Sequence, residues 1–257
     1  MNAASAVLFF ILVAIGFTVT GIVGFGANVL MMPILSMVFP IQDLVLIFAL
    51  ISFVNASYRM VESRRGILWR PFARMVLISM SGTALGLWVF RLLPELWLKL
   101  LLGCFVVAMA VYHLAMHRRT AQWAGSYADS RVRHFLYQVL LFVGGFLHGS
   151  FVCGGPMYVI YCNHYYGSNR AHFRGMQFGI VFVNSVLIML INLWHGAYTK
   201  ALIVPSVLGI AGLLAAFFIS GVLMKHLRDT TFYVLVQVVL LLSGASLCWQ
   251  SAAKLLI

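Results

Sequence analysis

Acidic residues are almost absent from this sequence. Its 257 residues include five Asp and Glu against 17 Lys and Arg, which gives a formal net charge of +12. The five acidic residues all lie at the ends of apolar runs or in loops: Asp43, Glu62, Glu95, Asp129 and Asp229. Cation sites and proton relays inside membranes use buried carboxylates, which are costly to bury and are kept for function. The shortage therefore argues against a carrier of metal cations and favours a neutral or anionic substrate.

Metal-binding and catalytic motifs are missing as well. The four cysteines form no CxxC pair and no zinc-finger spacing, which argues against a disulfide framework and a structural zinc site. The chain contains no HExxH, no GxSxG and no paired carboxylates. We therefore expect no metal, no cofactor and no enzymatic step. The four cysteines and eight histidines leave an intramembrane enzyme as an alternative.

Polar segments long enough to form a soluble domain are also lacking. Hydrophobic residues make up 63% of the chain and charged residues only 9%. The apolar runs lie at residues 3–24, 25–39, 41–58, 72–90 and 98–116, and again at 134–151, 153–166, 176–194, 201–223 and 232–251. A helix needs roughly 20 apolar residues to cross the hydrocarbon core of a bilayer. The sequence therefore predicts an all-α polytopic membrane protein.

Glycine breaks the apolar sequence at two related places. Residues 21–28 read Gly-Ile-Val-Gly-Phe-Gly-Ala-Asn, and residues 149–156 read Gly-Ser-Phe-Val-Cys-Gly-Gly-Pro. A broken helix is tolerated in a membrane where the freed backbone groups face protein or a water-filled cavity. An offset of 128 residues superposes the two clusters and keeps the later apolar runs in the same order. We interpret this as two homologous halves, residues 1–116 and 134–257, joined by a basic linker at 117–133.

The distribution of positive charge predicts how the halves are inserted. If each glycine-broken pair returns to the side from which it enters, 13 of the 17 Lys and Arg lie on one face. If each pair crosses fully, the division is 11 to 6, so the positive-inside rule favours returning hairpins. A returning hairpin plus three transmembrane helices makes each half odd in crossings, which predicts inverted repeats. Whether the hairpins are re-entrant or fully spanning stays open.

The same charge pattern bears on location and partners. The Lys and Arg residues fall in short loops between apolar runs, so topology accounts for the net charge without a nucleic-acid partner. We expect a multi-pass protein of a bacterial inner (plasma) membrane with the basic loops, including the linker, in the cytoplasm. Its expected partners are the lipid bilayer and a small anionic substrate.

The glycine clusters resemble the paired glycine signatures of the sulfite exporter TauE/SafE family. The likeness rests on Gly-Phe-Gly-Ala-Asn at 24–28 followed by Pro33, and on Gly-Phe at 145–146 through Cys-Gly-Gly-Pro at 153–156. It covers nearly the whole chain. The sequence departs from the family pattern at Ala27 and Asn28, where a glycine run is usual, and at Val152. The resemblance implies a permease for sulfite, organosulfonates or related small anions, with no enzymatic step.

Backbone groups at the two breaks are the first candidates for a substrate site. Broken helices present free N–H groups and positive dipole ends to an anion, and glycine lets the backbone approach closely. We expect Gly26, Ala27 and Asn28 to face Gly154 and Gly155, with the Asn28 amide as a directional donor. The alternative is that these glycines only permit close packing of helices.

Several side chains complete the predicted site. Asn55 and Asn184 lie within apolar segments at near-equivalent positions of the two halves, so they either donate to an oxyanion or bond between helices. His148 precedes the second break and either balances an anion, carries a proton, or is a neutral buried histidine. Cys153 lies within that break, as a contact to a sulfur-containing ligand or simply as a small residue.

Two tyrosines after the second break are the last candidates. Tyr158 and Tyr161 are three residues apart and share a helix face, so their hydroxyls are predicted to line a pathway.

The sequence therefore predicts a membrane transporter for small anions, with a site at the midplane between two broken helices. Sulfite, organosulfonates and related sulfur oxyanions are the expected substrates. A transporter of small organic carboxylates, an intramembrane enzyme and a membrane interaction protein that does not transport are the alternatives.

Overall fold

The chain is all-helical in the computed structural model, which describes residues 3–23, 26–117, 131–223 and 229–255; no strand occurs in these ranges. The first half contains α1 (Ala3–Val23), α2 (Ala27–Leu35), α3 (Ile41–Ser63), η1 (Arg64–Gly66), α4 (Trp69–Leu92) and α5 (Glu95–His117). The second contains α6 (Arg131–Phe151), α7 (Gly155–Tyr166), α8 (Arg170–Trp194), η2 (Lys200–Leu202), α9 (Ile203–Leu223) and α10 (Asp229–Leu255). Seven of the described helices are long and apolar enough to cross a membrane. The expected all-α membrane architecture is thus confirmed.

Local sequence explains where two of the helices begin. α3 starts directly after Pro40, and α8 starts after Asn169, whose side-chain oxygen accepts hydrogen bonds from the N–H groups of Ala171 and His172. Such caps satisfy N–H groups that have no partner within the helix. Most of the linker predicted at 117–133 lies outside the described residues.

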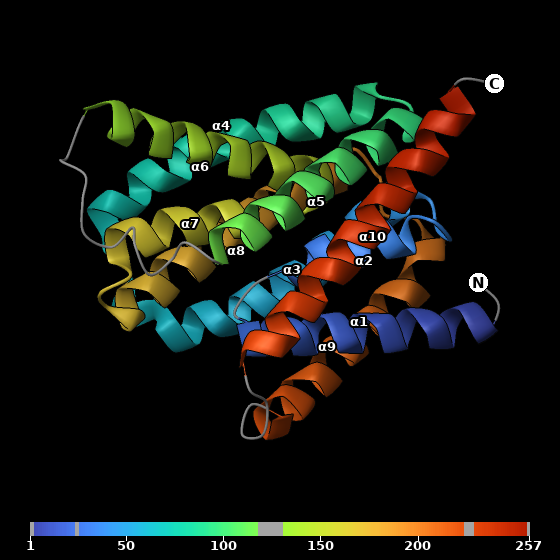
Figure 1. Cartoon of the computed structure of the whole chain (residues 1–257), viewed down its shortest axis with the longest axis horizontal. Coiled ribbons are helices and arrows are strands. Elements are labelled where there is room, and N and C mark those ends of the chain that lie inside the picture. The colour runs from blue at the N-terminus through green and yellow to red at the C-terminus, as the bar shows by residue number, and fades with distance from the viewer. Residues whose placement is uncertain (1–2, 24–25, 118–130, 224–228, 256–257) are drawn as a thin grey trace.

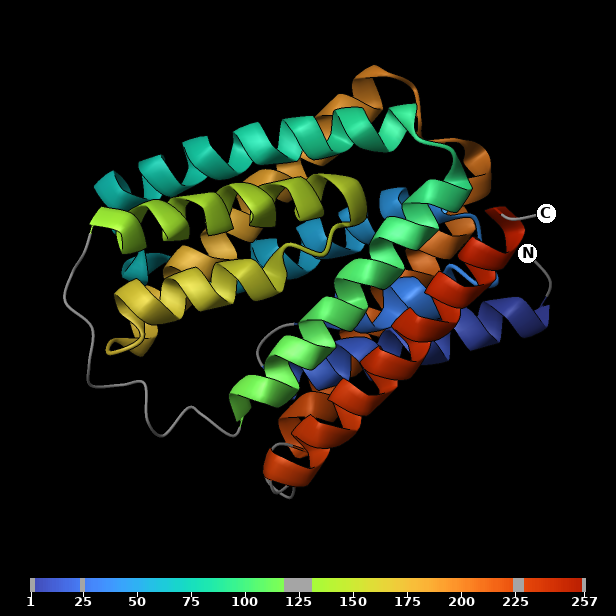
Figure 2. The same ribbon diagram turned by 45° about the horizontal axis from the view of Figure 1, so that its top comes forward.

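The long helices pack in four pairs, each joining distant parts of the sequence. α4 lies along α6, α1 along α9, α3 along α8, and α5 along α10 (Figures 1 and 2). Buried apolar side chains fill the space between them in two clusters, the larger of which includes Phe9, Met32, Phe48 and Leu98. Each of these four pairs joins one helix of residues 1–117 to one of residues 131–255.

Glycines make the α4–α6 contact close. A Cβ atom on Gly145 or Gly149 of α6 would overlap a backbone carbonyl of α4, and the same holds in reverse for Gly82 and Gly86. Each helix therefore presents a Gly-xxx-Gly pair to the other, as small residues do between membrane helices. Gly149, the first residue of the second glycine cluster, lies inside α6 in this interface and not at the break itself.

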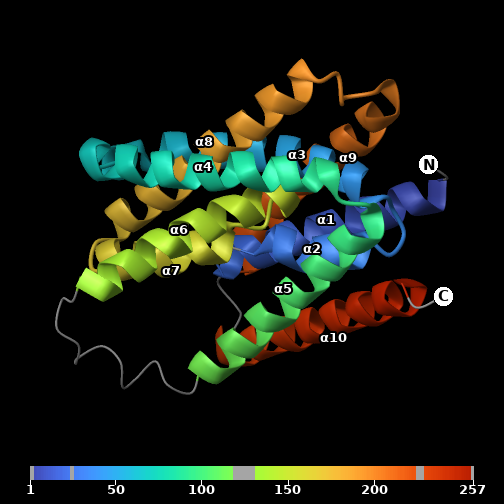
Figure 3. The same ribbon diagram turned by 90° about the horizontal axis from the view of Figure 1, so that it is seen from above.

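α2 and α7 double back toward the end from which their hairpins start. With nine and twelve residues, at about 1.5 Å per residue, they are about 14 and 18 Å long, well short of a roughly 30 Å hydrocarbon core. The α2–α3, α4–α5 and α8–α9 connections lie at one end of the molecule (Figure 3). η1 and the α7–α8 connection lie at the other, so the two hairpins enter from opposite ends.

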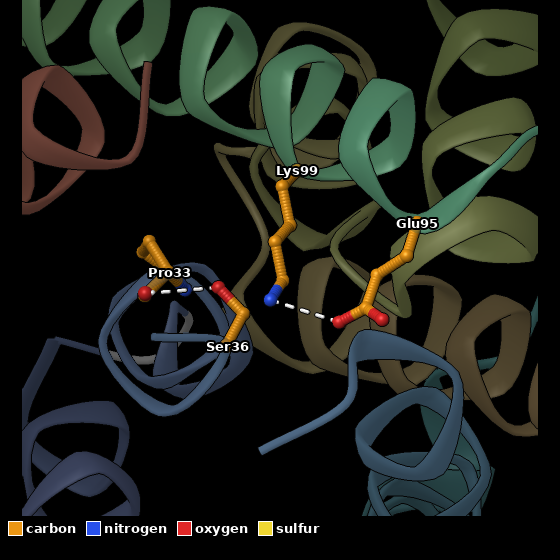
Figure 4. A network of polar contacts seen from close by, with 4 residues as sticks. All are labelled: Pro33, Ser36, Glu95 and Lys99. Carbon is orange, nitrogen blue, oxygen red and sulfur yellow. Dashed lines mark hydrogen bonds and ion pairs between the residues drawn. The ribbon is translucent and has the colours of Figure 1, made fainter. Parts of the chain in front are cut away.

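The two ends differ in charge. At the end of η1, the side chains of Arg64, Arg65, Arg70 and Arg74 are all exposed. At the opposite end, Lys99 Nζ on α5 pairs with Glu95 Oε1 at 2.8 Å, beside the end of α2, where the Ser36 hydroxyl donates to the carbonyl of Pro33 (Figure 4). We name the η1 side the basic end.

A cavity between the two helix breaks

The first break turns at a glycine with a positive φ. Gly26 has φ 103° and directly precedes α2. Residues with a Cβ atom rarely adopt this region, which explains the glycine here. A Cβ atom on Gly26 would have no neighbour within 4 Å, so the residue also borders open space.

The second break turns at a residue that is not glycine. α6 ends at Phe151, and Val152 has φ 56°, a left-handed conformation that is strained for a β-branched residue. The N–H of Val152 still bonds to the carbonyl of His148 at 2.8 Å, and that of Cys153 reaches the carbonyl of Leu147 at 3.3 Å. These bonds fold the end of α6 back on itself and turn the carbonyl of Val152 outward, toward α2.

Asn28 joins the two breaks directly. Its amide nitrogen donates to the carbonyl of Val152 and to the hydroxyl of Ser52 on α3, both at 2.8 Å. These two bonds use both amide hydrogens within the protein, so the role of Asn28 as a donor to a ligand stays a prediction. Its Oδ1 is buried and has no hydrogen-bond partner among the described residues. The atom that Asn28 leaves available is therefore an acceptor.

A cavity of about 60 Å³ lies at this junction. Of the predicted residues, those that line it are Gly26, Ala27, Asn28, Asn55, His148, Cys153 and Gly155. The structure adds residues that sequence reasoning did not assign: Phe17, Thr20, Val29, Ser52, Val152, Pro156, Gln177, Phe178 and Val181. Among the described residues that line the cavity, none is Asp, Glu, Lys or Arg. Helical spacing was the available clue for Ser52, which lies one turn before the predicted Asn55.

Two helix N-termini border the cavity. The first intrahelical bond of α2 runs from Leu30 to the carbonyl of Gly26, and that of α7 from Tyr158 to the carbonyl of Gly154. The N–H groups before these bonds have no partner within their helix, and the helix dipole makes this end positive. Ala27 and Gly155, the first residues of the two helices, both line the cavity. A Cβ atom on Gly155 would meet nothing within 4 Å, so this glycine leaves space.

Asn55 and His148 bring further polar groups to the cavity wall. Asn55 Oδ1 accepts a hydrogen bond from Arg59 Nε at 3.1 Å, which leaves the amide nitrogen as the end that can donate elsewhere. His148 is 1% exposed, and its Nε2 lies 3.3 Å from the hydroxyl of Ser185. Its Nδ1 finds no partner among the described residues. The cavity wall thus offers a ligand both hydrogen-bond donors and hydrogen-bond acceptors.

The thiol of Cys153 forms a hydrogen bond within the second break, and its contact with a ligand stays a prediction. Its Sγ lies 3.1 Å from the carbonyl of Phe151, to which it donates, and the residue is 1% exposed. Among the described residues no group of His, Cys, Asp and Glu is arranged to hold a metal ion.

Four predicted residues do not line this cavity. Gly154 packs against α6, because a Cβ atom there would overlap the carbonyl of Gly144. Asn184 and Tyr158 belong to a buried network: the Asn184 amide nitrogen reaches Ser79 Oγ at 2.7 Å and Tyr158 Oη at 3.1 Å, and its oxygen accepts from Thr83. Tyr161 lines a different cavity at the basic end. Their predicted contact with substrate stays a prediction.

Residues 8–247 match the family model described as Sulfite exporter TauE/SafE. The chain belongs to the sulfite exporter TauE/SafE family. No curated protein and no solved structure matches it. As a TauE/SafE member whose described residues include seven helices able to span a bilayer, it is an integral multi-pass membrane protein, and the family supports a transporter of sulfur anions.

Proposed function

We propose that this TauE/SafE protein transports a small sulfur oxyanion, and that the cavity between the two breaks is its substrate site near the membrane midplane. The observation that carries the proposal is the meeting of two helix N-termini at one cavity whose lining residues include no acidic side chain. Positive helix ends and free N–H groups stabilise an anion without a fixed positive charge. A site of this kind can bind and release its ligand without breaking a buried ion pair.

The size of the cavity favours a small substrate. One water needs about 10–15 Å³. A cavity of about 60 Å³ therefore suits a ligand of about four to six non-hydrogen atoms, and sulfite has four. A larger organosulfonate requires the two hairpins to move apart.

The unpaired acceptor of Asn28 supports a protonated ligand. A buried acceptor without a partner costs about 1–3 kcal/mol, which a ligand hydroxyl recovers. Hydrogen sulfite offers oxygens to the helix N-termini and one hydroxyl to Asn28 Oδ1. We therefore take the singly protonated oxyanion as the bound form.

The helix pairs support related halves of opposite orientation. α1 of the first half packs on α9 of the second, and the corresponding α6 of the second packs on α4 of the first. α3 with α8 and α5 with α10 pair corresponding helices. If each helix is replaced by its counterpart in the other half, the same four pairs result. This is expected for the inverted repeats of secondary transporters. The positive-inside rule then assigns the basic end to the cytoplasm of a bacterial inner membrane.

Uptake of radiolabelled sulfite into proteoliposomes tests the proposal. We expect saturable uptake by the wild-type protein and at least a tenfold loss in Gly155→Ala, because the added methyl group occupies the cavity without touching other atoms. Ala211→Val adds apolar atoms at an exposed position of α9 and is the matched control, with uptake unchanged.

Competing substrates belong in the same assay. Uptake of a small carboxylate with no uptake of sulfite would replace the proposed substrate class. Absence of flux for every anion, with a folded protein, would overturn the transport proposal itself.

A further inference from the structure

A second, larger cavity lies at the basic end, outside the junction of the breaks. It measures about 500 Å³ and is bordered by the start of α4, the start of α6 and the end of α7. Its lining residues are Arg70, Pro71, Arg74, Leu77, Ile78, His134, Gln138, Tyr161, Tyr165 and Tyr166. None of them lines the cavity between the breaks, so this second cavity has to be explained separately.

Two arginines give this cavity its charge. Arg70 and Arg74 are one helical turn apart on α4, and both are exposed. Neither makes an ion pair within the described part of the chain, and none of the residues that line the cavity is acidic. Guanidinium groups bind phosphate oxygens through paired hydrogen bonds, so two of them on one helix face suit a phosphate group.

Polar contacts hold the opposite wall in place. His134 Nδ1 lies 2.8 Å from the hydroxyl of Tyr165, and Gln138 Nε2 lies 3.2 Å from His134 Nε2. Tyr161 and Tyr165 pack beside them, with ring centroids 4.7 Å apart and ring planes tilted by 41°. The cavity is therefore a formed feature of α6 and α7, which face the arginines of α4.

The cavity is polar at one side and apolar at the other. Trp69, next to Arg70, is 69% exposed, as aromatic side chains are at the interface between membrane and water. Leu77, three residues beyond Arg74, is 70% exposed and lines the cavity, and Leu136 on α6 is 59% exposed. An inorganic anion makes no use of this apolar side, whereas a lipid tail does.

We propose that this cavity binds an anionic phospholipid, with the phosphate between Arg70 and Arg74 and an acyl chain along Leu77. Basic pockets between membrane helices recognise anionic headgroups in this way. The bound lipid contacts α4, α6 and α7 together and so fastens α7, whose first residue borders the other cavity. The proposal requires a membrane protein but not sulfite transport.

Lipid binding to the purified full-length protein tests this site without a flux measurement. Native mass spectrometry and thermal unfolding in detergent are compared with phosphatidylglycerol, phosphatidylcholine or inorganic phosphate added. We expect retained phosphatidylglycerol and stabilisation at lower concentrations than phosphatidylcholine. Removing one charge costs about fivefold in affinity, so Arg70→Gln with Arg74→Gln weakens binding roughly 25-fold.

The matched control removes two arginines from the same end. Arg64→Gln with Arg65→Gln on η1 should keep wild-type lipid binding. Equal loss in both double variants would mean general attraction to the basic end and would overturn the site. Stabilisation by inorganic phosphate through Arg70 and Arg74 would make it a free-anion site instead. If the double variant fails to fold, Arg74→Lys retains the charge but not the paired hydrogen bonds, and is expected to bind more weakly.

Discussion

At the scale of single residues, the orientation of the Asn28 side-chain amide determines which of its atoms form hydrogen bonds between the two breaks. Asn28 spends both amide hydrogens on Ser52 and Val152, and thereby links the first half of the chain to the second. The remaining oxygen is buried without a partner among the described residues, and Asn28 lines the cavity at which the two helix N-termini meet. Compared with a simple glycine run, Asn28 therefore gives the first break two additional features: a hydrogen bond to the second break, and an acceptor oxygen without a partner.

Replacing Asn28 by aspartate tests the hydrogen bonds of this side chain without changing its size. Asn28→Asp has nearly the same shape but donates no hydrogen bond and brings a negative charge to the cavity. We expect sulfite flux to fall at least tenfold, equivalent to about 1.4 kcal/mol or more, measured in proteoliposomes. Ser52→Ala removes one of the two bonds and should have the smaller effect. Wild-type flux in Asn28→Asp would show that this oxygen does not face the substrate.

Asn184 corresponds in sequence position to Asn55, but it belongs to a buried hydrogen-bond network, whereas Asn55 lines the cavity between the breaks. It satisfies the hydroxyls of Ser79, Thr83 and Tyr158, all fully buried or nearly so. Asn184→Leu should lower the free energy of unfolding by about 1–3 kcal/mol for the polar groups left without partners. Thermal unfolding in detergent measures this loss. Flux per folded molecule should stay near the wild-type value, and a selective loss of flux would instead favour substrate contact.

At the scale of helices, glycines with similar sequence surroundings have two different structural roles. Gly145 and Gly149 let α6 touch the backbone of α4, whereas Gly26 and Gly155 border open space. The sequence presented both uses as alternatives for the clusters. The contacts assign one use to each glycine, and they make Gly155 a cleaner test position than Gly154, which packs against Gly144.

Val152 offers a test of the second break as a structural element. Its positive φ predicts that glycine is tolerated better than alanine there, which is the reverse of the order inside a helix. We expect Val152→Gly to be about 1 kcal/mol more stable than Val152→Ala, because both lose the buried side chain and only glycine loses the strain. Chemical unfolding of the two variants measures the difference. The opposite order would mean that the turn relaxes when the side chain is removed.

At the scale of the whole molecule, the hairpins and the charges define two ends. Arg64 belongs to η1, at the basic end, and Lys200 belongs to η2, in the α8–α9 connection at the opposite end (Figure 3). Single cysteines at these positions, in a background without the four native cysteines, should be labelled from opposite sides by an impermeant thiol reagent. We expect Arg64→Cys to react in inside-out vesicles and Lys200→Cys in intact cells. Labelling of both from one side would contradict the proposed topology.

Much of the architecture could be predicted from the chain alone, because apolar length and helix breaks are local properties. The run predicted at 176–194 lies in α8, and the break before α7 falls within the glycine cluster at 149–156. The cavity was harder to predict, because its lining combines residues of six helices. Seven of the predicted residues meet there, but Tyr158, Tyr161, Asn184 and Gly154 point to other neighbours.

The sequence by itself determined the class of protein, the positions of its helices and the scarcity of acidic side chains, since each depends on composition or on neighbours along the chain. Only the tertiary structure decided which glycines pack and which leave space, where the two N-termini meet, and that Asn28 presents its oxygen. These features depend on contacts such as Asn28 with Val152, 124 residues apart. No local pattern fixes a bond between segments so distant, because its geometry is set by the packing of the helices that carry them.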